Sequence, residues 1–174
     1  LSQLSIWIHT FVPGLPLSLL DHNLIQGNSL IGIDSLEKIK EKLDEAKGTL
    51  FELDAEEILK KAAQPLMKLA KLSESSIKDI EEGRILIEEA KNNIKEIKSF
   101  CDIITAQPLS KDPNLSGYFF ERFALQKDEK LTLKALNLAK NILQTTTPIH
   151  FPVAFPEVFL SKSKGFNVIL GNPP

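Results

Sequence analysis

A charged middle section, residues 36–104, constrains the fold more than any other feature, because its apolar residues recur every three or four positions. One series comprises Leu36, Ile39, Leu43, Ala46, Leu50 and Leu53. Two further series repeat every seven residues: Ile80, Ile87, Ile94 and Cys101, and Gly83, Ala90, Ile97 and Ile104. Such spacing places an apolar seam along one side of a helix. We therefore expect two or three helices folded into an antiparallel arm, with a helix over 75–104 roughly 45 Å long at ~1.5 Å per residue.

Local signals within this section predict where the helices begin and end. Asp54 followed by Glu57 is typical of a helix N-cap with its reciprocal partner. Gly48 and Pro65 are expected to break or kink the pattern, since proline lacks a backbone donor and collides with the preceding turn.

The charges divide the chain into three parts. Residues 1–35 contain no Lys or Arg, whereas residues 37–104 hold 16 acidic and 13 basic residues in close mixture. We expect 1–35 to be part of the interior of a larger domain, 36–107 to be a helical insertion, and 108–174 to return to that domain. The acidic excess of the arm predicts weak binding to duplex DNA at most.

The flanking parts contain shorter elements. A short strand is expected over 24–26 and an amphipathic helix over 128–143, with Leu131, Ala135, Leu138 and Ile142 on one face. Pro148, Pro152 and Pro156 predict an extended path. The apolar run 166–170 predicts a strand, followed by Gly171-Asn172-Pro173-Pro174. The predicted fold class is therefore mainly α with a few short strands.

Composition excludes several classes of protein. The chain is 43% hydrophobic and 25% charged, values typical of a soluble globular protein, and no apolar run approaches the ~20 residues of a membrane span. We expect a cytoplasmic protein without membrane contact. Cys101 is the single cysteine, which excludes a disulfide framework, and its heptad position predicts a buried thiol. His9, His22 and His150 are too scattered for a metal spacing, so no metal site is expected.

The sequence at the carboxyl end resembles motif IV of the amino-group DNA methyltransferases, which is Asn-Pro-Pro followed by an aromatic residue. In that chemistry a side-chain amide oxygen and a backbone carbonyl accept hydrogen bonds from the two N–H groups of adenine's amino group. The prolines hold the carbonyl rigidly. The target base is first flipped out of the duplex. The alternative interpretation of Asn172, Pro173 and Pro174 is a turn that ends a strand.

The resemblance extends over essentially the whole chain. The segments 151–159 and 165–174 are similar to a block of the large fused restriction–modification adenine methylases, and 15–22 and 27–32 are similar to the preceding block. The stretch from Lys61 to Asp102 is like the helical insertion of those enzymes.

The resemblance implies a long antiparallel helical arm inserted into part of a Rossmann-like α/β methyltransferase domain. That domain binds S-adenosylmethionine through a glycine-rich loop that this sequence does not contain, so we expect the isolated chain to be inactive and to lack a tight cofactor site. Asn172, Pro173 and Pro174 correspond to the target-base site. Asn28 corresponds to a cofactor contact in the motif III region, with a simple turn-forming role as the alternative.

Two functions remain open at this stage. The first is a segment of a site-specific DNA (adenine-N6) methyltransferase of a restriction–modification or phage-defence system, acting on duplex DNA. The second is a non-catalytic helical interaction module that binds a protein partner through the arm. The uncharged opening part and the apolar run into Asn-Pro-Pro favour the first, because an interaction arm needs neither.

Overall fold

The computed structural model describes residues 23–45, 54–72, 76–112 and 129–171, together with Ser5, Ile8 and Leu115. This part of the chain is mainly helical, as the sequence predicts. Its longer helices are α2 (Leu36–Glu45), α3 (Ala55–Leu69), α4 (Ile77–Ala106) and α6 (Glu129–Leu143). Three short ones are the 3-10 helix η2 (Gln107–Leu109), α7 (Phe151–Ala154) and α8 (Pro156–Phe159).

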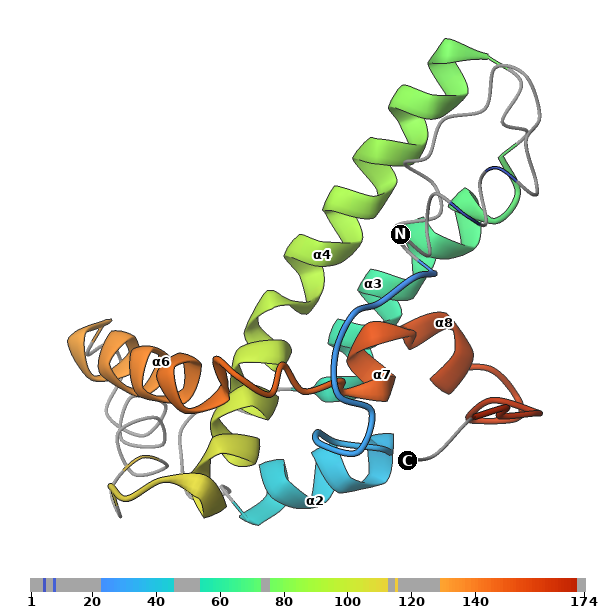
Figure 1. Ribbon diagram of the computed structural model, residues 1–174. Coiled ribbons are helices and arrows are strands. Elements are labelled where there is room, and N and C mark those ends of the chain that lie inside the picture. Colours follow the sequence, from blue (N-terminus) through green and yellow to red (C-terminus); the bar gives the residue numbers. More distant parts are fainter. Residues whose placement is uncertain are drawn as a thin grey trace.

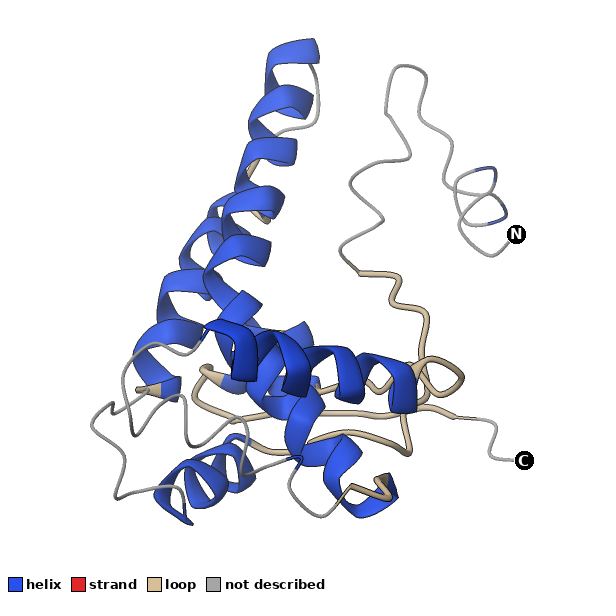
Figure 2. Ribbon diagram, turned by 90° about the vertical axis from the view of Figure 1, so that its left-hand side faces the viewer, coloured by secondary structure: helices blue, strands red, loops and turns tan. Residues whose placement is uncertain are grey.

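Helices α3 and α4 form the predicted antiparallel hairpin, which projects from the other helices (Figures 1 and 2). Helix α4 has 30 residues, so it is roughly 45 Å long. Both predicted heptad series face inwards: Ile87, Ala90, Ile97 and Cys101 are buried. The facing side of α3 presents Ala62, Ala63 and Leu66, and the two small alanine side chains let the helices approach closely.

Side-chain caps fix where the two hairpin helices begin. The Asp54 carboxylate accepts hydrogen bonds from the backbone N–H groups of Glu56 and Glu57 at 2.9 and 3.0 Å, so the predicted N-cap is confirmed. A full capping box forms instead at α4, where Ser76 and Asp79 each accept from the other's backbone N–H. Each such cap stabilises a helix by about 1 kcal/mol.

Of the break or kink predicted at Pro65, the break is wrong, because α3 runs through this residue, and Gly48 lies outside the described residues. Proline cannot donate to the carbonyl oxygen of Lys61, four residues earlier. The side-chain amide of Asn93, on α4, donates to that oxygen at 3.1 Å. The neighbouring helix thus supplies the donor that proline lacks.

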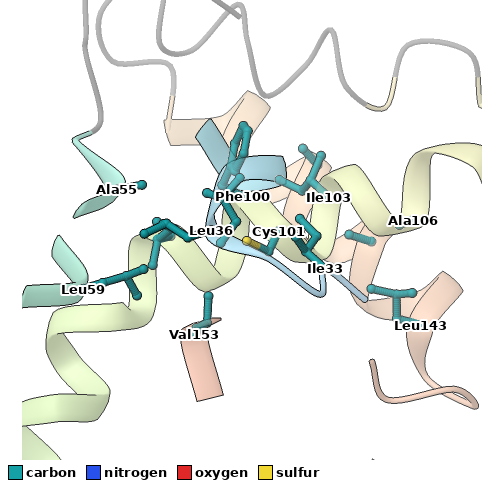
Figure 3. Packing of buried hydrophobic residues seen from close by; sticks show 14 of the residues in the cluster. Ile33, Leu36, Ala55, Leu59, Phe100, Cys101, Ile103, Ala106, Leu143 and Val153 are labelled. Atoms are coloured by element: carbon teal, nitrogen blue, oxygen red, sulfur yellow. The ribbon is translucent and has the colours of Figure 1, made fainter. Parts of the chain in front are cut away.

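The hydrophobic core lies at the base of the hairpin, where α2, α3, α4, α6 and α7 meet (Figure 3). Phe100, Ile103 and Cys101 of α4 are completely or almost completely buried there, and the thiol behaves as the predicted small apolar group. Burial raises the pKa of the Cys101 thiol well above its ordinary value. The predicted helix over 128–143 is confirmed as α6, which contributes chiefly Ala135, Ala139 and Leu143 to this core.

Two sequence expectations for the flanking parts are wrong, the first in part. The extended path predicted for the proline-rich stretch holds from Pro148 to His150 and is wrong beyond it, since Pro152 and Pro156 lie in the first turns of α7 and α8. Proline suits those positions, because its φ angle is preset and the first N–H groups of a helix have no partner inside it. The short strand predicted over 24–26 is also absent; that segment has irregular structure.

Residues 166–170 do not form the predicted strand. A strand needs a neighbouring strand for its backbone hydrogen bonds, and none of the described segments provides one. The side chains of Val168, Ile169 and Leu170 are 72, 78 and 92% exposed. A Rossmann-like sheet is therefore not part of the described structure, and the Rossmann-like context stays a prediction.

Candidate functional site

A segment from the part before the helical arm and a segment from the part after it lie against each other, although more than a hundred residues separate them. Asn28 and Pro148 form an isolated parallel β-bridge. The N–H of Asn28 donates to the Thr147 carbonyl at 2.9 Å, and the N–H of Ile149 donates to the Asn28 carbonyl at 3.2 Å. Further along, the N–H of Phe151 donates to the Ile33 carbonyl at 2.9 Å. We call residues 27–33 and 147–151 together the flank junction.

Glycine is required at the flank junction. Gly32 has a φ of +129°, a conformation that side-chain-bearing residues rarely adopt. A Cβ atom at this position would collide with the backbone carbonyl of Ile149. At Gly27 it would lie 2.7 Å from the Thr147 carbonyl oxygen. The two glycines of the Gly27-Asn28-Ser29-Leu30-Ile31-Gly32 block thus let the flanking backbones come together.

A buried histidine connects the junction to the long helix. His150 is 3% exposed, and its Nδ1 accepts a hydrogen bond from the backbone N–H of Ile33 at 3.1 Å. Its Nε2 lies 3.0 Å from Oδ1 of Asp102 on α4. Because Nδ1 accepts, the proton of the neutral ring is on Nε2 and is donated to the Asp102 carboxylate.

Asp102 is held by two donors. Lys98, one turn earlier on α4, lies 2.7 Å from its other carboxylate oxygen. Burial by itself raises the pKa of Asp102, but the hydrogen bonds from His150 and Lys98 outweigh burial and bring the pKa below its ordinary value. The carboxylate is therefore ionised at neutral pH. Sequence reasoning missed this group, because the histidines were considered only for metal spacing and His150 is 48 residues from Asp102.

The predicted site residues are placed only in part. The Oδ1 atom of Asn28 accepts a hydrogen bond from the N–H of Leu30 at 2.9 Å, so the side chain does form a turn. A cofactor contact by Asn28 stays a prediction. Asn172, Pro173 and Pro174 lie outside the described residues.

The segment that leads to Asn172 is anchored by one aromatic side chain. The ring of Phe166 makes edge-on contacts with Phe151, Phe155 and Phe159, with centroid distances of 6.4, 5.3 and 6.0 Å. Such pairs contribute ~0.5–1.5 kcal/mol each beyond the area that they bury. Phe166 thus attaches the final segment to α7 and α8, which directly follow the flank junction.

A cavity of about 520 Å³ opens between α4 and α6 beside the Asp102 group. Charged, amide and apolar side chains line it together: Lys98, Asp102, Lys140, Asn141, Gln144, Leu136, Leu143, Thr147 and Pro148. Cavities of this size accommodate small ligands or parts of larger ones.

Two kinds of site are not found within the described ranges. No three or more His, Cys, Asp or Glu side chains gather there in a way that could hold a metal ion. None of the helices described is both long and apolar enough to cross a membrane. Comparison of the chain with protein-family models, with curated proteins and with solved structures gave no match.

Proposed function

We propose that this chain is a segment of a DNA (adenine-N6) methyltransferase of the restriction–modification or phage-defence type, and that residues 36–107 are a helical insertion in its catalytic domain. The observation that carries the proposal is the flank junction. Residues 27–33, from the part assigned to the host domain before the insertion, are hydrogen-bonded to 147–151, from the part assigned to it after the insertion, so the two parts lie together as portions of one domain would. These segments also adjoin the blocks that resemble the adenine methylases.

The exposed apolar run 168–170 supports the same proposal. Three successive, largely exposed apolar side chains are unfavourable in water, at about 25 cal/mol for each Å² of apolar surface. Docking of this run as a strand in a sheet of the complete domain would bury them. The resemblance places Asn172 at the end of that strand.

In the proposed reaction the Asn172 side-chain oxygen and the backbone carbonyl of Pro173 accept hydrogen bonds from the two N–H groups of the amino group of a flipped adenine. This interaction localises the lone pair of the amino nitrogen, which is otherwise delocalised into the ring. S-adenosylmethionine would supply the methyl group: the amino nitrogen bonds to the methyl carbon as the bond from that carbon to sulfur breaks, S-adenosylhomocysteine leaves, and one amino proton passes to solvent. Pro173 and Pro174 restrict the backbone, so the accepting carbonyl needs little reorganisation in the transition state.

Substitution of Asn172 in the protein that contains this chain tests the proposal. Asn172→Ala should lower the single-turnover rate of methyl transfer by ~10²–10³, by analogy with the loss of one preorganised polar contact. The affinity for S-adenosylmethionine should be nearly unchanged, because the residue faces the base.

Asn167→Ala is the matched control, since Asn167 is an exposed amide in the same segment. It should retain the wild-type rate. If folded Asn172→Ala protein keeps most of its activity, Asn172 is a turn residue and the catalytic assignment is wrong.

A further inference from the structure

The basic side chains of α4 gather on one side of the helix. Arg84, Lys91, Lys95 and Lys98 are separated by seven, four and three residues, which places them in one row. All four are exposed. The row covers about 21 Å of helix axis at ~1.5 Å per residue.

The acidic residues of the same helix are mostly on other sides. Glu82, Glu89 and Glu96 each precede a member of the row by two residues, a rotation of about 200° around the helix axis. Three acids lie on the same side as the row: Glu81 three residues before Arg84, Glu88 between Arg84 and Lys91, and Asp102 four residues after Lys98. On this side of α4 the basic residues therefore outnumber the acidic ones by four to three, whereas the arm as a whole has an acidic excess.

The row continues onto a second helix at the base of the hairpin. Lys140 of α6 lines the 520 Å³ cavity together with Lys98, and the amide side chains of Asn141 and Gln144 line it too. Asp102 is the acid in this wall, and it is already engaged by Lys98 and His150. For Arg84, Lys91, Lys95 and Lys140 the structure records no ion pair with any described residue. We call Arg84, Lys91, Lys95, Lys98 and Lys140 the basic row.

We propose that the basic row binds the phosphate backbone of duplex DNA, with the amides at the cavity mouth as further donors to phosphate oxygens. Charge complementarity carries this assignment. About 21 Å of helix corresponds to roughly six base-pair steps of a duplex at ~3.4 Å each. Arg, Lys, Asn and Gln side chains provide most side-chain contacts to phosphates, which set position without reading sequence.

This inference rests on the proposed function and adds a role for the arm. The basic row ends at the cavity, whose wall includes Thr147 and Pro148 of the flank junction. The row therefore reaches the segment that leads into α7. The arm would thus fix the duplex in position while a base is flipped at the catalytic site.

The test measures binding of the 174-residue chain to a fluorescein-labelled duplex of about 20 base pairs by anisotropy, over a range of salt concentrations. We expect weak binding that falls steeply with salt, because each contacted phosphate contributes about −0.9 to the slope of log K against log salt. The triple variant Arg84→Gln, Lys91→Gln, Lys95→Gln should bind at least about tenfold more weakly at low salt. Its slope should be smaller in magnitude by about 3.

The matched control is Lys68→Gln, Lys71→Gln, Lys78→Gln, which removes the same charge from exposed positions outside the row. It should keep most of the binding and the full salt slope. Equal losses in the two triple variants would overturn the proposal, because binding would then follow net charge alone. So would a wild-type chain that does not bind at low salt, or one that binds polyglutamate as well as DNA, which would point to an acidic protein partner.

The outcome is separable from that of the catalytic assignment. The triple variant in the row should lower DNA binding by the chain, and that measurement involves no methyl transfer. Loss of binding in the row variant together with no methylation of DNA by the wild-type protein that contains this chain would leave the basic row standing and remove the methyltransferase proposal.

Discussion

Replacement of His150 by Ala should destabilise the fold by about 2–4 kcal/mol. The imidazole makes two hydrogen bonds at 3.0 and 3.1 Å and is 3% exposed. Its loss leaves the N–H of Ile33 without an acceptor, at ~1–3 kcal/mol for a buried group. Asp102 keeps Lys98 as a donor, so the loss of its second hydrogen bond adds only about 1 kcal/mol.

Thermal and denaturant unfolding of the chain measure this loss. For a chain of this size each kcal/mol lowers Tm by roughly 2–4 °C, so we expect a decrease of about 4–16 °C. Two further variants separate the bonds. In His150→Asn the new amide oxygen can replace Nδ1 as the acceptor for Ile33, and in His150→Gln the new amide nitrogen can replace Nε2 as the donor to Asp102.

Each amide variant should recover part of the stability that His150→Ala loses. Gln144→Ala is the control, because Gln144 is exposed in the turn that follows α6. A loss below about 0.5 kcal/mol in His150→Ala, similar to that of the control, would refute the idea that this side chain joins the flank junction to α4.

Local geometry supports three more predictions. Gly32→Ala should lower the free energy of unfolding by more than about 2 kcal/mol, because of the φ of +129° and the collision with the Ile149 backbone. Gly165→Ala, with open space around the glycine, should change it little. Similar losses in the two variants would contradict this prediction. Asn93→Ala should lower the free energy of unfolding by ~0.5–1 kcal/mol. A double-mutant cycle should show a smaller loss in a Pro65→Ala background, because the introduced alanine restores the N–H that donates to the Lys61 carbonyl. Equal losses in both backgrounds would mean that Asn93 does not replace the donor that Pro65 lacks. Hydrogen bonds from Lys40 and Lys60 lower the pKa of Glu56 to about 2. The contribution of Glu56 to stability is therefore complete above its unfolded-state pKa of 4.5 and is lost as the pH falls towards 2. An NMR titration should show this low pKa, and Lys40→Gln should raise it.

The helical arm could be predicted because its signal is local. Heptad spacing identified the inward face of α4. The spacing of Asp54 and Glu57, three residues apart, predicted the N-cap of α3. The proline-rich stretch was assigned wrongly beyond His150 because proline both ends helices and begins them, and only the backbone that precedes Pro152 and Pro156 decides between the two.

The flank junction and the histidine group could not be predicted, because they depend on contacts between distant residues. His150 meets Asp102 and Ile33 only after the hairpin has returned the chain to its base. The strand expected over 166–170 failed for a related reason, since an apolar run with β propensity forms a strand only beside a partner. The basic row is also local in sequence, but its significance depends on Lys140, which α6 brings to it.

Mass spectrometry of nucleosides from DNA tests the central claim most directly. The protein that contains this chain is expressed in cells that lack their own adenine methylation, and the genomic DNA is digested to nucleosides. We predict N6-methyladenine in the wild-type sample, at one short sequence context when the DNA is mapped, and its loss with Asn172→Ala. Absence of N6-methyladenine despite stable expression, or methylation of cytosine instead, would contradict the account.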